Sequence, residues 1–256
     1  NKDEAADIGL VGDTKLTIGA LITTIKAKTN GKGCGNRTQV ESAVSDAKAK
    51  WMAEWSPILE GNEEPISYYR VIQALNDVLD PDKSIVTHDA GAPRDTIVPF
   101  YRATTPHSYI GWGKTTHLGF GIPLMIGAKM AEPEKFCLNL MGDGAFGMSG
   151  TDIETSARSG AVITTVLLNN SAMATYSGPT QGTIGKEARE IYGVSTMHGD
   201  YAKIAEGMGA VGIKVSKISE LEPALVEAQR LNASGKAVLI EVAANVEDRR
   251  SRFIPR

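Results

Sequence analysis

Short apolar runs alternate along the chain with segments whose apolar positions recur at helical spacing. The runs predict buried strands, because each is short and rich in apolar side chains; they lie at 84–87, 136–141, 162–168, 211–215 and 237–242. Helical spacing or composition predicts helices between them, at 67–79, 124–131, 152–159, 200–207 and 218–231. This alternation is typical of a doubly wound, mostly parallel α/β sheet with helices on both faces.

The N-terminal segment does not fit that alternation. It predicts one strand at 8–13, one amphipathic helix at 14–28 and then a glycine-rich linker. One strand and one helix cannot bury a core by themselves, so we expect this segment to pack on protein outside the chain. We therefore divide the chain into an appendage, residues 1–36, and a main domain, residues 37–256, which opens with a helix at 38–55.

The centre of the pattern is a strand, a glycine-rich turn, a helix and a second strand. Gly142, Asp143 and Gly144 follow the first strand, and Asn169 and Asn170 follow the second. A βαβ crossover of this kind makes its two strands parallel neighbours. Ligands bind at the carboxyl ends of such strands, so we expect a carboxylate and a carboxamide to converge there from adjacent loops.

The helix of this crossover carries signals at both ends. Thr151 and Glu154 have the spacing of a capping box. Gly160 is a typical C-terminal stop. The helix is therefore expected to span 152–159.

The turn after the first strand combines an acid with features of a phosphate site. Small glycines let backbone N–H groups approach a phosphate, and a helix N-terminus favours an anion. A carboxylate among such amides would repel the phosphate unless a cation lay between them. Asp143, Asn170 and a backbone carbonyl are hard oxygen ligands, which suit Mg²⁺ completed by phosphates and water.

Two other interpretations of this turn stay open on the residues alone. Asp-Gly is a common dipeptide of surface turns. Gly142, Gly144 and Gly147 also match the G-x-G-x-x-G fingerprint of dinucleotide-binding oxidoreductase domains, after a strand and before a helix. That fingerprint needs an acid at the end of the second strand to hold a ribose, where this chain has the asparagine pair, and Asp143 would repel a pyrophosphate.

The turn and the asparagine pair together resemble the GDG…NN motif of thiamine diphosphate (ThDP) enzymes, at the spacing that family uses. The resemblance covers nearly the whole chain. It implies the pyrophosphate-binding (PP) fold, the C-terminal domain of the superfamily that contains acetolactate synthases, oxalyl-CoA decarboxylases and 2-hydroxyacyl-CoA lyases. It also implies that Asp143, the side chain of Asn170 and the carbonyl of Ala172 hold Mg²⁺ on the cofactor diphosphate.

A second segment, 117–123, resembles the stretch that precedes the GDG motif in this family. There a large apolar residue supports the thiazolium and bends the cofactor, and Leu118 stands at that place, with core packing as its other interpretation. Gly119 is expected to contact the aminopyrimidine, and His117 to face substrate or to pack inward; we count Leu118 and His117 as candidate catalytic residues. The resemblance implies further cofactor contacts at Ala90, Gly91, Ala92, Gly142, Gly144, Ala145 and Met173.

The choice of substrate is less constrained. The run 145–150 is closer to oxalyl-CoA decarboxylases and 2-hydroxyacyl-CoA lyases than to acetolactate synthases, whereas 171–176 departs from the pattern of those lyases. We expect a lyase, decarboxylase or carboligase that acts on a 2-oxo acid or a 2-hydroxyacyl-CoA, with an acetolactate synthase-type transferase as the alternative. Arg249, Arg250 and Arg252 suit an acid or CoA substrate if the C-terminal tail covers the site; the other interpretation is a frayed terminus.

Half of the family's active site has no counterpart in this sequence. Family sites lie between a PP domain and a pyrimidine (Pyr) domain, whose glutamate activates the cofactor. The resemblance therefore implies a partner, either a Pyr-domain chain or an N-terminal fragment that supplies the glutamate, in a hetero- or homo-oligomer. Residues 1–36 resemble the tail of the central domain of three-domain ThDP enzymes. A non-catalytic subunit that keeps the fold for assembly is the competing hypothesis.

Composition narrows the remaining classes. The chain has 256 residues, 42% of them hydrophobic and 22% charged, and a net charge of −3. Nothing in this balance suggests a nucleic acid or a membrane surface as partner. No apolar run approaches the roughly 20 residues of a membrane span, and the charged start is unlike a signal peptide. Cys34 and Cys137 are expected to be unpaired, so a cytoplasmic location is the default.

Overall fold

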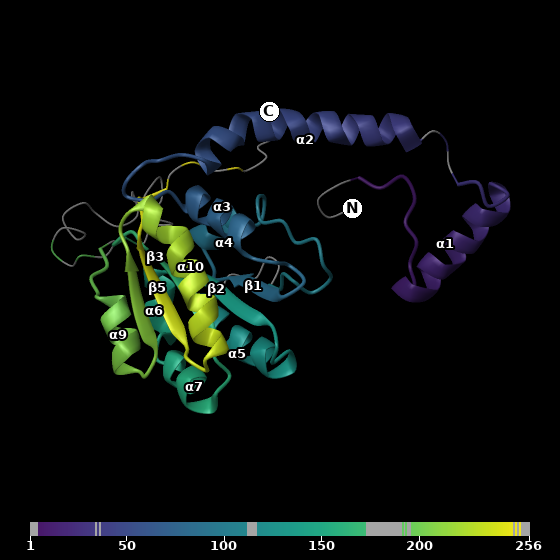
Figure 1. Cartoon of the computed structure of the whole chain (residues 1–256). Coiled ribbons are helices and arrows are strands. Elements are labelled where there is room, and N and C mark those ends of the chain that lie inside the picture. The colour runs from purple at the N-terminus through teal and green to yellow at the C-terminus, as the bar shows by residue number, and fades with distance from the viewer. Residues whose placement is uncertain are drawn as a thin grey trace. The chain divides into compact units, whose positions relative to one another are not determined.

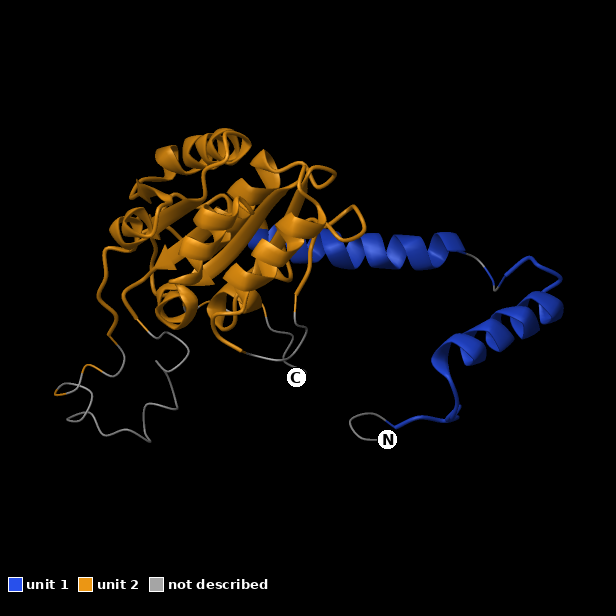
Figure 2. Cartoon of the chain, turned by 90° about the horizontal axis from the view of Figure 1, so that it is seen from below, with its two compact units in different colours: residues 1–55 blue, residues 56–256 orange. Residues whose placement is uncertain are grey.

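The structure, a computed structural model, describes residues 5–33, 35, 37–111, 117–172, 191, 193, 196–247, 249 and 251. It divides the chain into two compact units, residues 1–55 and residues 56–256 (Figure 2). The strands and the predicted chemistry belong to the second unit. The assignment of residues 1–36 to a separate domain stays a prediction.

The described part of unit 1 contains α1 (Thr14–Lys28) and most of α2 (Arg37–Leu59) (Figure 1). The carboxylate of Asp13 accepts the N–H of Leu16 at 3.0 Å, and this cap begins α1 where the sequence predicted. The strand predicted at 8–13 is wrong. These residues are irregular and exposed, because no described residue of unit 1 forms a strand with which they could pair.

The side chains of unit 1 bear on how α1 and α2 are used. The indole rings of Trp51 and Trp55 stack with centroids 5.5 Å apart, which confirms that they share one face of α2. None of the residues of α1 is buried. Its exposed apolar side chains are Leu16, Ile18, Leu21, Ile22 and Ile25. This exposure fits the expectation that α1 packs on protein outside the chain, which stays a prediction.

Unit 2 is built on a parallel sheet of five strands in the order β1-β2-β3-β5-β4. The strands are β1 (Ser84–His88), β2 (Phe136–Gly142), β3 (Thr164–Asn169), β4 (Val211–Val215) and β5 (Val238–Ala243). β1, β2, β3 and β5 are buried along nearly their whole length. The uninterrupted apolar runs in the sequence follow from this burial on both faces.

Helices cover both faces of the sheet, as predicted for a doubly wound fold (Figure 1). They are α3 (Tyr68–Val78), α4 (Ala92–Ile97), α5 (Gly121–Ala131), α6 (Asp143–Ser149), α7 (Asp152–Ser159), α9 (Tyr201–Gly207) and α10 (Ile218–Ala233). Residues of α5, α6, α7 and α9 share one hydrophobic cluster with residues of the strands. On the opposite face α4 and α10 contact the strands, and α3 packs against both of these helices.

The predicted capping box of α7 is wrong, although the predicted end of this helix is confirmed. Thr151 has helical φ and ψ of −64° and −22° and makes no side-chain cap, because α7 follows directly on α6 and the chain does not open into the extended conformation that a cap requires. Glu154 instead pairs with Arg158 at 2.7 Å. Gly160 ends α7 with φ of +75°, a conformation that favours glycine.

Two observations bear on the compositional predictions. Among the described residues, no helix has the length and apolar character that a bilayer crossing requires. Cys137 is a buried free thiol, as predicted, and burial raises its pKa to about 11. Cys34 lies outside the described residues.

Candidate functional site

Two loops and the start of α6 meet at the carboxyl edge of the sheet because β1, β2 and β3 are parallel neighbours. His88 at the end of β1 pairs with Leu140 of β2, and Gly142 at the end of β2 pairs with Leu168 of β3. The segments that follow these strands therefore leave the sheet side by side. They carry most of the residues that the sequence singled out, from Ala90 to Ala172.

Asp143 is the buried acid of this edge. Its side chain is only 3% exposed, and Oδ1 accepts the N–H of Gly144 at 2.8 Å. No donor in the described part of the chain bonds to Oδ2. Burial raises the pKa of Asp143, and the backbone N–H groups of Gly144, Ser171 and Ala172 oppose this shift. The loop after β3 therefore lies against this carboxylate, which keeps one oxygen for a ligand.

The loop after β3 is held by its two asparagines. Asn170 accepts the N–H of Ala172 through Oδ1 at 2.9 Å and donates Nδ2 to the hydroxyl of Tyr68 at 2.8 Å. Ser171, between Asn170 and Ala172, has φ of 55°, in the left-handed region. Asn169 and Asn170 are half-buried, so neither is a surface turn residue turned toward bulk solvent. Tyr68, at the start of α3, was not predicted, and its distance along the chain left no sequence signal.

The loop after β1 is organised by Asp89, which the sequence did not single out. This carboxylate is fully buried. Oδ1 accepts the N–H groups of Ala90 at 2.8 Å and Gly119 at 2.9 Å, and Oδ2 accepts that of Gly121 at 2.9 Å. Asp89 thus brings the segment with Leu118 to this edge. The N–H of Ala90 is already used, whereas Gly91 is half-buried with φ of +83° and Ala92 begins α4.

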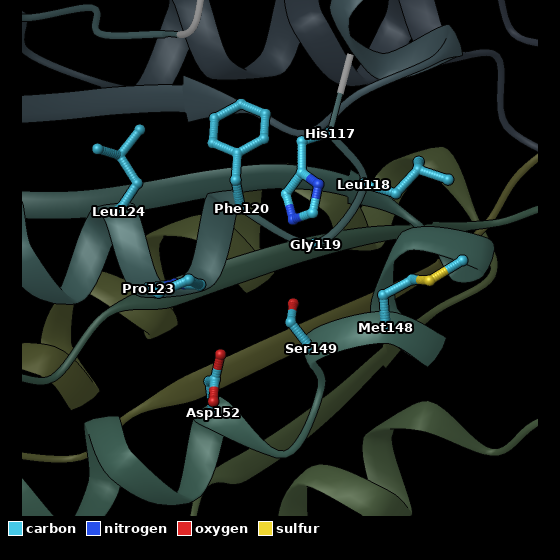
Figure 3. A pocket seen from close by; sticks show the side chains of 9 residues that line it. All are labelled: His117, Leu118, Gly119, Phe120, Pro123, Leu124, Met148, Ser149 and Asp152. Carbon is cyan, nitrogen blue, oxygen red and sulfur yellow. The ribbon is translucent and has the colours of Figure 1, made fainter. Parts of the chain in front are cut away.

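The segment 117–119, which carries Leu118, lines a pocket of ≈ 580 Å³ together with residues from α5, α6 and α7 (Figure 3). Leu118 is half-buried and His117 is exposed, and the imidazole points into the space below it, across from the hydroxyl of Ser149. Gly119 has φ of +90°, and a Cβ there would lie 3.1 Å from Cβ atoms of Met148 and Ser149. The segment 117–119 and the end of α6 are therefore packed so closely that only glycine fits at position 119.

His88, the last residue of β1, packs inside the protein. Its ring is buried between Tyr109 and Phe120, with centroids 5.8 and 5.9 Å away. Nδ1 lies 3.1 Å from the carbonyl of Asp89. Burial lowers the pKa of His88, so the ring stays neutral in this aromatic setting.

One family's sequence model matches residues 89–242, and its description is "Thiamine pyrophosphate enzyme, C-terminal TPP binding domain". The match spans more than half of the chain and contains the loops after β1, β2 and β3. The chain belongs to this family. Thiamine pyrophosphate is ThDP, so the family resemblance and the fold predicted from the sequence are confirmed.

Curated relatives of known name are about one quarter identical to this ThDP-binding chain. They include the acetolactate synthase large subunit of Buchnera aphidicola subsp. Schizaphis graminum, 26% identical over 94% of this chain and 41% of the relative. Pyruvate oxidase of Lactiplantibacillus plantarum is 25% identical over 94% and 38%. A 3D-(3,5/4)-trihydroxycyclohexane-1,2-dione hydrolase of Halalkalibacterium halodurans is 25% identical over 88% and 38%. The chain thus spans about two fifths of the length of these relatives.

The residues at the edge fit a hard cation and a diphosphate. Asp143 offers a buried carboxylate oxygen that no donor among the described residues reaches, and the amide oxygen of Asn170 lies in the loop after β3. The described residues hold no group of three or more His, Cys, Asp or Glu side chains that could bind a metal. A single acid with amide and carbonyl oxygens leaves positions for phosphates and water, which Mg²⁺ favours.

The sequence-predicted set is therefore partly brought together. Gly142 ends β2, Gly144 and Ala145 lie in the first turn of α6 beside Asp143, and Asn170 and Ala172 lie in the loop after β3. Leu118 and Gly119 belong to the segment tied to Asp89. Met173, Arg250 and Arg252 lie outside the described residues. Glu241 is a further residue that the prediction missed, although an acid inside the apolar run of β5 was a visible signal.

Proposed function

We propose that this chain is the diphosphate- and Mg²⁺-binding part of a ThDP-dependent lyase, decarboxylase or carboligase acting on a 2-oxo acid or a 2-hydroxyacyl-CoA. The observation that carries the proposal is the buried Oδ2 of Asp143, which no described donor reaches. Burying a carboxylate oxygen without a partner costs free energy. A bound cation would offset that cost by bonding to Oδ2.

In this proposal, the ligands of Mg²⁺ are Asp143, Asn170 and the carbonyl of Ala172, together with phosphate oxygens. The diphosphate can approach the backbone closely, because the residues around it have no side chain or a single methyl group. These residues are Gly142, Gly144 and Ala145 on one side and Ala90, Gly91 and Ala92 on the other. Bound ThDP supplies the carbanion chemistry. The chain contributes grip, orientation and exclusion of water.

The segment 117–119 has a different role in this proposal. Leu118 supports the thiazolium and keeps the cofactor bent, and the backbone of Gly119 contacts the aminopyrimidine. His117 is exposed at the pocket, which supports a place facing substrate rather than the core. In this proposal both side chains act by contact with the bound cofactor or substrate.

The activating glutamate comes from a partner in this proposal. The chain spans 41% of the Buchnera acetolactate synthase subunit, and none of its segments resembles a Pyr domain. We assign that role to a Pyr-domain chain or N-terminal fragment, and residues 1–36 to the tail of a central domain. The free thiol of Cys137 supports a reducing, cytoplasmic setting.

A second candidate is an acetolactate synthase-type transferase. The names of the relatives favour it, because acetolactate synthases occur repeatedly among them. The two candidates share the cofactor site and differ in acceptor. In the presence of the partner, formation of acetolactate from pyruvate favours the transferase, whereas decarboxylation of a 2-oxo acid without such a product, or cleavage of a 2-hydroxyacyl-CoA, favours the first candidate.

Calorimetric titration with ThDP and Mg²⁺ tests the shared proposal. The wild-type chain is expected to bind both ligands together, and Asp143→Ala to bind neither measurably. Glu227→Ala, which removes an exposed acid of α10, serves as the matched control and should bind like the wild type. Absence of binding by the wild type, or equal binding by Asp143→Ala, contradicts the proposal.

Catalytic assays of the same preparations test the partner. We expect the purified chain to bind ThDP and turn over nothing until a chain with a Pyr domain is added. Full activity of the chain alone would show that it supplies its own activating acid.

A further inference from the structure

Asn169, the first residue of the asparagine pair, has no role in the proposed ligand set. Its Nδ2 donates to Oε1 of Glu241 at 2.7 Å. Its Oδ1 accepts the N–H of Ser171 at 3.1 Å and the hydroxyl of Ser171 at 3.3 Å. The side chain therefore links the core strand β5 to the loop that carries Asn170 and Ala172.

Glu241 is an unusual residue for its position. It lies within β5, between neighbours that are fully buried, and is itself only 8% exposed. Its second oxygen, Oε2, accepts the N–H of Ala202 in the first turn of α9 at 2.8 Å. Both oxygens are thus hydrogen-bonded, which offsets the cost of burying the charge. An apolar residue would suit the strand better, unless the contacts themselves matter.

The linked loop lies against the proposed metal ligand. Gly142 of β2 pairs with Leu168 of β3, so Asp143 and the loop after β3 leave the sheet from adjacent strands. The backbone N–H groups of Ser171 and Ala172 help to oppose the rise in the pKa of Asp143. Tyr201, the first residue of α9, lies close enough to both acids that their charges add to the effect of burial, which raises its pKa to about 12. Glu241, Asn169 and Asp143 therefore belong to one packed group around the turn at Ser171.

We propose that Glu241 is a positioning residue for the metal site, acting through Asn169 on the turn at Ser171 so that Asn170 and the carbonyl of Ala172 face Asp143. This inference rests on the proposed function. Glu241 touches neither metal nor cofactor. Its carboxylate fixes the orientation of the Asn169 amide, and Asn169 in turn holds the left-handed turn, whose φ of 55° is sparsely populated for a residue other than glycine.

The first test is the affinity for Mg²⁺ in the presence of saturating ThDP, at a temperature where circular dichroism shows every variant folded. Glu241→Ala should weaken binding about 10–100-fold, the usual effect of removing a residue that orients a metal ligand. Glu241→Gln retains an acceptor for Asn169 but not for Ala202, so it should lower the melting temperature while leaving the affinity within about threefold of the wild type.

Two further variants separate positioning from stability. Asn169→Ala removes the same link from the loop side, so its affinity for Mg²⁺ should match that of Glu241→Ala. The double variant should bind Mg²⁺ no more weakly than either single variant. Asn169→Ala also keeps the test available if Glu241→Ala does not fold. Asp200→Ala removes the cap of α9, since Asp200 accepts the N–H of Lys203 at 3.2 Å, but leaves Glu241 and Asn169 joined. Its Mg²⁺ affinity should stay that of the wild type.

Hydrogen exchange of the ligand-free chain makes the outcome independent of the proposed function. The amides of Ser171 and Ala172 should exchange at least tenfold faster in Glu241→Ala than in the wild type, and unchanged in Asp200→Ala. If the wild type binds no ThDP while this difference holds, the proposed function fails and the positioning role stands. Unchanged exchange, or an affinity loss that only follows the loss of melting temperature across all variants, overturns the positioning role.

Discussion

At the scale of single residues, Asp143 shows a site that exists at the expense of stability. One oxygen is bonded to Gly144 and the other has no described donor, although the side chain is 3% exposed. A half-satisfied buried acid lowers the stability of the ligand-free chain. In the proposed function, a bound cation would supply the missing partner of this oxygen.

The raised pKa of Asp143 predicts a pH dependence. Because burial raises the pKa of Asp143 in the folded chain, the folded state binds its proton more tightly than the unfolded state, and the free energy of unfolding falls as pH rises above about 4 through the folded pKa. Asp143→Asn cannot titrate and should lack this fall. Urea unfolding at pH 4 and pH 7 should show the variant gaining about 1 kcal/mol or more over the wild type. A constant difference between the two proteins would contradict the assignment.

Gly119 is the second residue whose identity the structure constrains. With φ of +90° and contacts of 3.1 Å awaiting a Cβ, Gly119→Ala combines backbone strain with overpacking and should cost roughly 3 kcal/mol. Gly160→Ala is the matched control, because its φ is +75° but nothing lies within 4 Å, so that only strain of about 1 kcal/mol remains. Equal losses in urea unfolding would show that the packing against α6 does not matter.

At the scale of elements, α5 begins without a cap from its own sequence. Phe120 at its N-cap position makes no side-chain hydrogen bond. Asp89, 30 residues before Gly119, accepts the N–H groups of Gly119 and Gly121 instead. One carboxylate therefore holds the loop after β1, the segment 117–119 and the start of α5.

Asp89→Asn should consequently affect more than one element. The amide can accept at one atom only, and its NH₂ group faces an N–H that Oδ2 had satisfied. We expect a loss of about 1.5–3 kcal/mol in the free energy of unfolding together with weaker ThDP binding. Asp200→Asn, the same change at the exposed start of α9, should cost little, since asparagine is an equally good N-cap. A wild-type value for Asp89→Asn would refute the shared role.

At the scale of the whole molecule, the described start and end of unit 2 are tied together. Ile66 pairs with Ala244 beside the sheet. Glu247, 1% exposed, accepts the hydroxyl of Ser67 at 2.8 Å and the guanidinium of Arg249 at 2.6 Å. Tyr69 donates to the carbonyl of Arg249 at 3.0 Å. The segment after β5 thus runs back to the first turn of α3, next to the residue that contacts Asn170.

Glu247→Gln tests how much this connection contributes. Burial by itself would raise the pKa of Glu247, but the hydrogen bonds from Arg249 and Ser67 outweigh it and hold the pKa below its ordinary value. The contribution to stability is therefore complete above about pH 4.3 and is lost as pH falls through the folded pKa. Urea unfolding should show the variant about 1.5–3 kcal/mol less stable at pH 7, with the gap closing at acid pH. A gap that persists at acid pH would assign the loss to packing instead.

The sequence predicted the sheet well because its signals are local and strong. The apolar runs at 136–141 and 162–168 became β2 and β3 with small shifts at their ends. The strand at 8–13 was predicted from the same kind of run and did not form, because a strand needs a neighbour that the described part of unit 1 does not offer. The capping box failed for a related reason, since Thr151 takes its conformation from the junction of α6 and α7.

The sequence by itself determined the order of the five sheet strands along the chain and the ThDP family, and it marked Asp143 and Asn170 as candidate metal ligands, because these depend on residue type and on spacing along the chain. It missed the short helices α4 and α6. Only the tertiary structure decided what holds the site residues. Tyr68 reaches Asn170, Asp89 reaches Gly119, and Glu241 reaches Asn169 across 102, 30 and 72 positions of sequence. A hydrogen bond forms between atoms about 3 Å apart, and folding alone brings such distant residues to that separation.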